Sequence, residues 1–278
     1  IELIPVHREH DRLLAGDFDP CVILLNNDLS DSVPEALLGL SQVITPPPEL
    51  GWSKRLKSDH FEYYRTAAIE FSKLIDIDPW FFDPMFSNCS EINFMERQGG
   101  ECLADKTESL LADIQRKYNE FGIDSTPYVV IKADAGTYGM GVMIARSPDD
   151  VITLNRKQRT RMSSSKGGKV INKVILQEGV PTYETWGDPG AVAEPVVYMM
   201  DRFVVGGFYR VHTKKGAEEN LNSPGMHFQP LAFDEPCNVP DAHIDPDAAA
   251  NRFYTYGVIG RLALLAAARE ILAISGDA

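Results

Sequence analysis

The stretch YVVIKADAGTYGMGVMIA, residues 128–145, is the part of the sequence from which the fold is best predicted. Two runs rich in β-branched and apolar residues, Tyr128–Lys132 and Val142–Ala145, flank a loop with three glycines, a pattern that predicts two strands. Glycines let backbone N–H groups approach phosphate oxygens closely, and Lys132 can contact a phosphate as a point charge. A Walker loop has its lysine after the glycines and leads into a helix, as a Rossmann loop also does. The stretch therefore predicts a phosphate-binding loop of another kind, with an ordinary hairpin loop as the alternative.

Upstream of this stretch, apolar residues recur twice at helical spacing. They predict helices over Ser58–Leu74 and Leu103–Phe121, the second ended by Gly122. Further upstream, Cys21–Leu25 (CVILL) reads as a buried parallel strand followed by polar residues. The triple proline at residues 46–48 ends this first unit. These features predict a small α/β unit followed by a helical segment.

Downstream of the glycine loop, the sequence predicts strands over Val170–Glu178 and Pro195–Val205. Gly206-Gly207 is a candidate for a type I′ turn that folds Phe208–His212 back as the second arm of a hairpin. A final helix is predicted from Asp245-Pro246 to about Ile274. The expected fold class is α+β, with antiparallel β-rich units and flanking helices.

The charge of the chain limits its partners. With 40 acidic and 27 basic side chains in 278 residues, the formal net charge is −13. Such a charge argues against nucleic acid as the main partner, because phosphate backbones attract basic surfaces. Small anions such as ATP stay compatible, since one local cluster of cations can reverse the field in a cleft.

Cysteine usage and hydropathy predict a cytoplasmic protein. The cysteines form no CxxC pair and no zinc-type spacing, so they are expected to be reduced thiols: Cys21, Cys89, Cys102 and Cys237. The apolar stretch Val258–Ala268 contains Arg261 and is too short to cross a bilayer. No signal peptide opens the chain, and no membrane partner is expected.

Candidate magnesium ligands precede the glycine loop. Glu91 and Asn93 offer a carboxylate and an amide oxygen two residues apart, which an extended backbone places on one side while Ile92 faces the core. A solvated strand face is the alternative interpretation. A third acidic ligand is sought in Asp134, within the loop, or Glu194, at the start of a strand, with Asp134 preferred.

Polar residues after the predicted hairpin are further candidates. Arg210 lies on its second arm, and Asn220 and Asn222 follow a lysine-bearing loop. An arginine near a transferred phosphate neutralises charge that develops in the transition state. The alternative is an edge-strand arginine followed by an ordinary turn. The basic segment Arg156–Arg161 and the residues after it suit a flap over phosphates or a solvated loop equally.

The combination of Lys132, a glycine loop between strands, and a strand ending in Gln177-Glu178-Gly179-Val180 resembles the ATP-grasp superfamily. The resemblance implies that adenine lies between two β-rich subdomains. It makes Lys132 a phosphate ligand and places the adenine hinge at Gln177, Glu178 and Val180. By the same resemblance Arg210, Asn220 and Asn222 have catalytic roles, and the loop glycines contact ATP: Gly136, Gly139 and Gly141.

Two upstream motifs resemble eukaryotic-type glutathione synthetase, a circularly permuted ATP-grasp enzyme. The stretch Asn88–Phe94, followed by Gly99-Gly100, is similar to the magnesium-binding EIN motif of that family. The permutation explains why Glu91 and Asn93 come before the glycine loop. The family's substrate-binding stretch is matched by three successive residues: Lys57, Ser58 and Asp59.

Across nearly the whole chain the sequence resembles the proteobacterial glutamate–cysteine ligase family. The segments that carry this likeness are 22–31, 52–61, 78–100, the glycine loop, 206–230 and 256–270. It implies an ATP- and Mg²⁺-dependent ligase that joins glutamate and cysteine through an acyl phosphate. A related ligase such as glutathione synthetase, or a module that binds ATP without turnover, are the alternatives.

The same likeness suggests a division of the chain. Residues 1–50 form a small α/β unit, the remainder of a substrate domain, and residues 51–278 form an ATP-grasp-like catalytic domain with residues 125–180 as its ATP lid. Members of the family usually carry a further N-terminal segment with an Asn-rich motif. A chain that had lost this segment would have an incomplete glutamate pocket and would be inactive; whether this applies here is not predicted. Amino-acid specificity and oligomeric state are not predicted.

Overall fold

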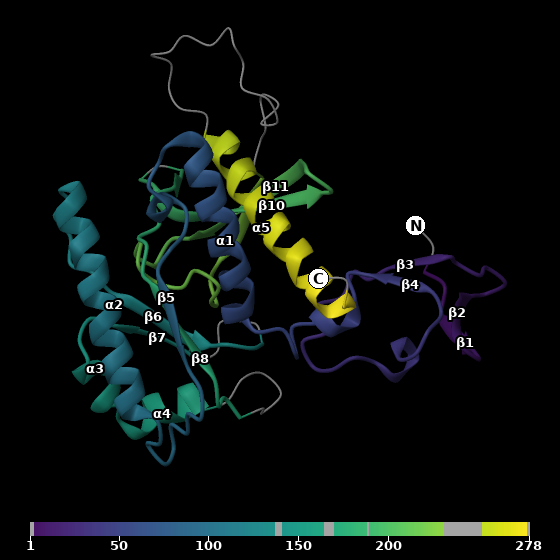
Figure 1. The fold of residues 1–278 in the computed structure, drawn as a ribbon, viewed down its shortest axis with the longest axis horizontal. Helices are drawn as coiled ribbons and strands as arrows, with labels where there is room; N and C mark the ends of the chain where they lie inside the picture. Colours follow the sequence, from purple (N-terminus) through teal and green to yellow (C-terminus); the bar gives the residue numbers. More distant parts are fainter. Residues whose placement is uncertain (1–2, 137–140, 164–169, 188, 231–251, 277–278) are drawn as a thin grey trace, which may run out of the picture.

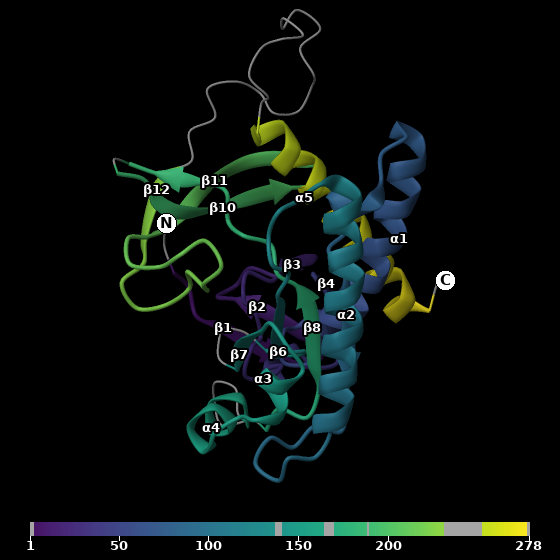
Figure 2. The ribbon, with the colours of Figure 1, turned by 90° about the vertical axis from the view of Figure 1, so that its left-hand side faces the viewer.

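The computed structural model describes residues 3–136, 141–163, 170–187, 189–230 and 252–276. Two four-stranded antiparallel sheets form its centre, and helices pack around them (Figures 1 and 2). The α+β class predicted from the sequence is thus confirmed. Some predicted features fall outside the described residues, among them Cys237, Asp245, Pro246 and the loop glycine Gly139.

The first sheet contains both strands that flank the glycine loop. Its order is β5-β8-β6-β7, with the strands β5 (Phe86–Cys89), β8 (Val174–Glu178), β6 (Val129–Ala133) and β7 (Val142–Ala145). Strand β6 alternates: Val129 and Ile131 are fully buried in the main core, while Val130 and Lys132 face the other side. The glycine loop therefore joins two neighbouring antiparallel strands, as predicted.

One face of this sheet is covered by α2 (Gly100–Phe121), with α3 (Asp149–Ile152) beside it (Figure 2). Helix α2 buries Leu103, Leu110 and Ile114 against the sheet, as its apolar spacing predicts. It ends at Gly122, whose φ of 65° suits a glycine cap. The helix leaves the opposite face of the sheet open to the functional site.

The second sheet has the order β12-β11-β10-β9, with β12 (His227–Pro230), β11 (Phe203–His212), β10 (Ala191–Met200) and β9 (Thr185–Trp186). The predicted hairpin exists, but its predicted turn is wrong. Gly206 and Gly207 lie inside β11, opposite Tyr198 and Val197. The chain turns instead at residues 201–202, where Asp201 has a φ of 52°. A register shift at Tyr198/Met199 accompanies the longer hairpin.

Two long helices pack together beside the sheets: α1 (Lys57–Ile75) and α5 (Arg252–Ser275) (Figure 1). Their contact buries small residues, with Ala67 and Ala68 of α1 against Ala266 of α5, so that the two backbones can approach closely. Near the start of α1, the buried carboxylate of Glu270 accepts two 2.6 Å hydrogen bonds from Arg55 and also bonds His60. The last turns of α5 are thus tied to the beginning of α1.

The N-terminal residues form two small sheets. Strands β1 (Val6–Glu9) and β2 (Arg12–Ala15) are antiparallel, and β3 (Val22–Leu24) and β4 (Val43–Thr45) are parallel. The predicted parallel strand is confirmed, but its predicted burial is wrong, because Leu24 is 79% exposed. Three short 3-10 helices follow in the connections: η1 (Glu35–Leu37), η2 (Pro48–Leu50) and η3 (Pro79–Phe81).

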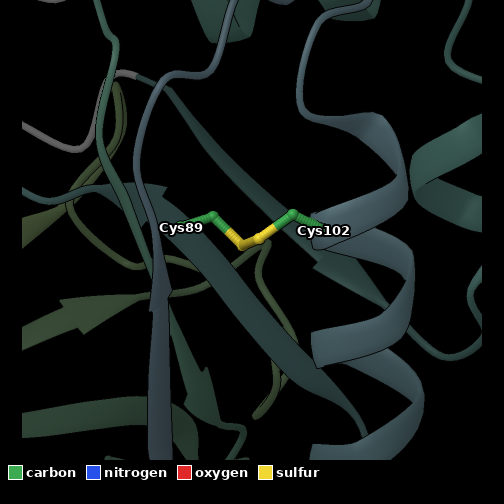
Figure 3. Close-up of a disulfide and its surroundings, with 2 residues drawn as sticks. All are labelled: Cys89 and Cys102. Carbon is green, nitrogen blue, oxygen red and sulfur yellow. A yellow bond between two sulfur atoms is a disulfide. The ribbon is translucent and has the colours of Figure 1, made fainter.

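The expectation of reduced cysteines is wrong for two of them. Cys89, the last residue of β5, is bonded to Cys102 in the first turn of α2, with Cα atoms 6.5 Å apart (Figure 3). Both cysteines belong to the core between the sheet and α2. The 13-residue separation carried no recognisable pairing signal, because only the fold brings α2 back over β5. Cys21 is free and exposed.

The helices were also compared with the thickness of a bilayer. In the part of the chain that the structure describes, no helix combines the length and apolarity that crossing a membrane requires.

Candidate functional site

A cavity of about 930 Å³ lies between the β6–β7 hairpin, strands β10 and β11, the loop 213–226, and helix α4 (Arg156–Ser163). The two sheets contribute residues that are far apart in the sequence. Of the predicted site residues, the cavity is lined by Lys132, Gly141, Val180, Glu194, Arg210, Asn220 and Asn222. The fold therefore brings together the phosphate ligand predicted in one sheet and the catalytic residues predicted in the other.

Charged groups of both signs face this cavity. Lys132 projects from β6, and burial lowers the pKa of its ammonium while Asp134 acts in the opposite direction. Arg210 and Glu194 are direct partners in the β10–β11 register, and an Arg210 Nη1 to Glu194 Oε2 distance of 3.1 Å joins them. Arg210 Nε is buried without a hydrogen-bond partner among the described residues. This guanidinium thus keeps a donor available.

The loop 213–226 forms another wall and carries both asparagines. The side chain of Asn220 accepts a 2.9 Å hydrogen bond from the backbone N–H of Asn222, so the two residues form one turn. The loop is fastened to the first sheet by an ion pair between Arg146 and Glu218. The N–H of Thr182 also donates to Ala217 O at 2.8 Å. The asparagines are therefore held beside the β6–β7 hairpin.

An apolar wall was not predicted. Its side chains come from alternate positions of β6 and β7 and from the residue two after β8: Tyr128, Val130, Val142, Ile144 and Val180. Gly179 makes this wall possible, because a Cβ at that position would lie 2.0 Å from the Tyr128 ring. The sequence contained a signal for this wall, because apolar residues stand at successive positions of both strands and thus occupy both faces of the hairpin. Only one of these faces is covered by α2.

The basic segment was predicted to be either a flap over phosphates or a solvated loop, and its first part is helix α4. Thr160 and Arg161 line the cavity, whereas Lys157 and Gln158 on the same helix do not. Residues 164–169, which complete the basic segment, lie outside the described residues.

The predicted substrate residues at the start of α1 hold the base of the glycine loop. Ser58 donates from its N–H to Asp134 Oδ1 at 2.8 Å and from its hydroxyl to Asp134 Oδ2 at 2.7 Å. Lys57 Nζ donates to the carbonyls of Ala133, Asp134 and Gly136 at 2.9, 3.2 and 2.9 Å. The carboxylate of the buried Asp134 accepts an N–H at the start of α1, as a capping side chain does. Of the two acids considered as a third metal ligand, only Glu194 lines the cavity.

The pKa of Lys57 predicts a pH-dependent effect on the binding of anions such as ATP. Burial and the neighbouring Lys132 lower this pKa to about 8. An anion bound near Lys57 and Lys132 favours the ammonium form and raises the pKa of Lys57, so its affinity is expected to fall as pH rises through about 8. The affinity falls about tenfold for each unit by which the bound anion raises the pKa of Lys57. Titration calorimetry from pH 7 to 9.5 measures it. In Lys57→Met the decrease in affinity near pH 8 is expected to disappear. An unchanged decrease would mean that Lys57 is not the group that causes it.

The other predicted residues of this region lie outside the cavity lining. Asp59 is exposed on α1, and partial burial and the charge of Asp134 raise its pKa. Gly136 donates to Trp52 O at 3.0 Å and lines a smaller cavity of about 110 Å³. Gln177 is buried on β8, opposite Val130.

Glu178 points away from the cavity. Its carboxylate accepts 3.0 Å hydrogen bonds from the Trp80 indole and from the Met85 N–H, on the side of the sheet edge formed by β5. Burial raises the pKa of this carboxyl, against these hydrogen bonds. Of the predicted hinge, only Val180 therefore faces the cavity by its side chain.

The predicted magnesium pair follows β5. Ile92 is buried in the core as predicted. Glu91 is exposed with a φ of 59°, so the backbone is not the extended strand that the alternation assumed. Asn93 Oδ1 accepts hydrogen bonds from the N–H groups of Met95 and Glu96, at 3.1 and 3.2 Å. Neither Glu91 nor Asn93 lines the cavity, and Glu91 forms no ion pair with the described residues.

The oxygen donors present suit a cation that arrives with a nucleotide. Among the described residues, no group of three or more His, Cys, Asp or Glu side chains could hold a metal alone. Magnesium commonly takes only one or two carboxylates and completes its coordination with phosphate oxygens and water. Glu194 supplies one carboxylate within the cavity, and Asn222 supplies an amide. This donor set fits a nucleotide-borne magnesium ion.

Comparison with known proteins identifies the family of the chain. The model of the glutamate-cysteine ligase family matches residues 1–271, and the chain belongs to this family. A crystal structure of a proposed gamma-glutamylcysteine synthetase from Methylobacillus flagellatus KT is 57% identical, with a TM-score of 0.84. The alignment covers 98% of this chain and 63% of that one, so the chain spans less than two thirds of its relative. No curated protein matches the chain.

Proposed function

We propose that this chain carries the ATP-dependent joining of glutamate and cysteine to γ-glutamylcysteine, through an acyl phosphate, in an ATP-grasp-like site. The observation that carries the proposal is the meeting of Lys132 and Arg210, from different sheets, in one cavity of about 930 Å³. Membership of the glutamate–cysteine ligase family supports the reaction. The partners are accordingly small molecules: ATP, glutamate and cysteine.

The cavity offers separate surfaces for the parts of ATP. The apolar wall with Tyr128 and Val180 suits the adenine ring, since flat aromatic groups bind to apolar surfaces bounded by a few polar groups. Lys132 lies on the same hairpin, near the glycine loop, and suits the phosphates. The predicted adenine hinge is thereby narrowed to the residues around Val180.

Catalysis in this proposal rests on positioning and charge neutralisation. The glutamate γ-carboxylate oxygen attacks the γ-phosphorus of ATP and ADP leaves, which gives the acyl phosphate. The cysteine amine then attacks the acyl carbon, loses a proton and displaces inorganic phosphate. Arg210 neutralises negative charge on the transferred phosphoryl group. Asn220 and Asn222 orient the substrate carboxyl group beside it.

Magnesium, when bound with ATP, would neutralise the charge of the phosphates and polarise them for attack. Glu194 is the cavity carboxylate that would hold it. The resemblance to the EIN motif adds Glu91 and Asn93 as predicted ligands. Glu194 lies on β10, whereas Glu91 and Asn93 lie in the turn after β5, so substitutions can distinguish the two sets.

The metal assignment predicts that Glu91→Ala removes magnesium-dependent turnover. Loss of one of the one or two carboxylates that magnesium usually takes leaves its charge unbalanced, and a fall in kcat of roughly 100-fold or more is expected. The measurement is ADP release across a magnesium titration, with Glu194→Ala in parallel and Glu96→Ala, on the same exposed turn as Glu91, as the control. Unchanged turnover in Glu91→Ala together with loss in Glu194→Ala would move the assignment to Glu194.

The proposed reaction is tested by phosphate release from ATP with different amino-acid pairs. Release with glutamate plus cysteine, and γ-glutamylcysteine seen by mass spectrometry, is the expected result. Release only with γ-glutamylcysteine plus glycine would identify a glutathione synthetase instead. ATP binding without release with either pair would indicate a nucleotide-binding module.

A further inference from the structure

A second cavity, of about 350 Å³, shares helix α4 with the larger cavity. It is enclosed by the turn before α2, the first turn of α2, α3, and α4. Helix α4 contributes Arg161 to the larger cavity and Arg159 to this one. The second cavity has no part in the proposed reaction.

Two arginines that form no ion pair with the described residues line this cavity. Arg159 Nη1 donates to Leu154 O at 2.7 Å, but Arg159 Nε is fully buried and has no hydrogen-bond partner among the described residues. Leaving a buried charged donor unsatisfied is unfavourable, so a ligand that accepts from it gains free energy. Arg97, on the facing turn, forms no ion pair or hydrogen bond with the described residues. Both guanidinium groups can therefore receive an anion.

The backbone adds donors at the same place. Helix α2, 22 residues long, begins here with Gly100, and its N-cap residue Gly99 provides no side-chain cap. The first N–H groups of such a helix have no partner within the helix, and the helix dipole favours negative charge there. This end of α2 supports the anion preference that the two arginines establish.

Much of the remaining surface of the cavity is apolar. Phe94, Leu103 and Leu154 are buried core residues that present part of their surface to it. Inorganic phosphate would leave this surface in contact with water, whereas a carboxylate with an apolar body would cover it. We propose that this cavity binds a small carboxylate that carries a branched or aromatic apolar group, with its carboxylate on Arg159 and Arg97.

One acidic residue also belongs to the cavity. Glu101 is exposed on the first turn of α2. Its charge opposes a simple carboxylate, although solvent screens it. Glu101→Gln is therefore expected to strengthen binding about twofold to threefold, the opposite of the effect of replacing either arginine.

The test uses 4-methylpentanoate as the probe and isothermal calorimetry or ligand-observed NMR on the full chain, first without and then with saturating ATP analogue. Saturable binding is expected, with 4-methylpentanamide at least tenfold weaker because it lacks the charge. Arg159→Leu and Arg97→Ala should each weaken binding about tenfold. Arg156→Ala, an exposed arginine on the same helix that does not line the cavity, should leave it unchanged.

Contrary outcomes are well defined. Equal binding of the acid and the amide, or no change in both arginine variants, would overturn the proposal. Displacement of the probe by the ATP analogue would place it in the larger cavity and also overturn it. Thermal unfolding checks that Arg159→Leu is folded, and exposed Arg97 gives a second variant if it is not. None of these readouts depends on ligase activity.

Discussion

Replacing Lys132 with alanine is expected to weaken ATP binding by roughly 10- to 100-fold, the loss associated with one charge-assisted hydrogen bond to a phosphate. Lys132 is the cavity-facing lysine of β6, and burial has already lowered its pKa. Bound phosphates remove that destabilisation of the ammonium, so the interaction with ATP is stronger than at an exposed lysine. Titration calorimetry with a non-hydrolysable ATP analogue and magnesium measures the change.

Lys157→Ala is the matched control, since Lys157 is exposed on α4 and does not line the cavity. Both variants remove one positive charge from an acidic chain, and only loss of a direct contact distinguishes them. Equal affinities for ATP in the two variants would mean that Lys132 is not a phosphate ligand, and the proposed nucleotide site would fail with it.

Replacing Arg210 with alanine is expected to lower kcat by roughly 100-fold or more while ATP affinity changes little. Arginines that stabilise a transferred phosphoryl group act mainly on the transition state, and losses of about 10³ or more are known for them. The affected rate is that of ADP release with glutamate and cysteine. A large change in ATP affinity at unaltered kcat would instead make Arg210 a ground-state ligand.

Glu194 complicates this variant, because it loses its 3.1 Å partner when Arg210 is replaced. Thermal unfolding of Arg210→Ala and of the double variant Arg210→Ala/Glu194→Ala separates the two effects: a structural defect caused by the unpaired carboxylate lowers the Tm of the single variant and is relieved in the double one, whereas a purely catalytic loss leaves the Tm of the single variant unchanged. Arg202→Ala, at the exposed turn of the same hairpin, serves as the control and should keep full activity.

The parts of the fold that could be predicted have a strong local period. The helix around Leu103–Phe121 and its glycine stop follow from residue spacing, and so does the alternation in Tyr128–Lys132. The hairpin turn could not be placed. Gly206-Gly207 has suitable turn chemistry, yet the partner strand selects the register, and that choice placed the turn at residues 201–202. The predicted burial of Leu24 was wrong for a similar reason, because burial of a strand depends on which other elements pack against it.

The structure brings part of the predicted site together. Lys132, Arg210 and the two asparagines line one cavity, while their roles in binding and catalysis stay predictions. Asp134 and Glu178 have equally suitable chemistry but turn to other partners, Ser58 and Trp80. The direction of a side chain at a strand end depends on which element packs there, and single-sequence patterns do not contain it.

The bonds from Glu270 to Arg55 and His60 connect the carboxyl-terminal helix to the glycine loop through a short series of neighbours. Arg55 is followed by Lys57 and Ser58, which hold the carbonyls and the carboxylate at the base of that loop. A protein shortened before residue 270 would keep every group that lines the large cavity. It would nevertheless leave Arg55 and His60 without the buried Glu270 carboxylate that they contact. Impaired nucleotide binding after such a truncation would therefore reflect a displaced glycine loop and not the loss of a residue that contacts the nucleotide.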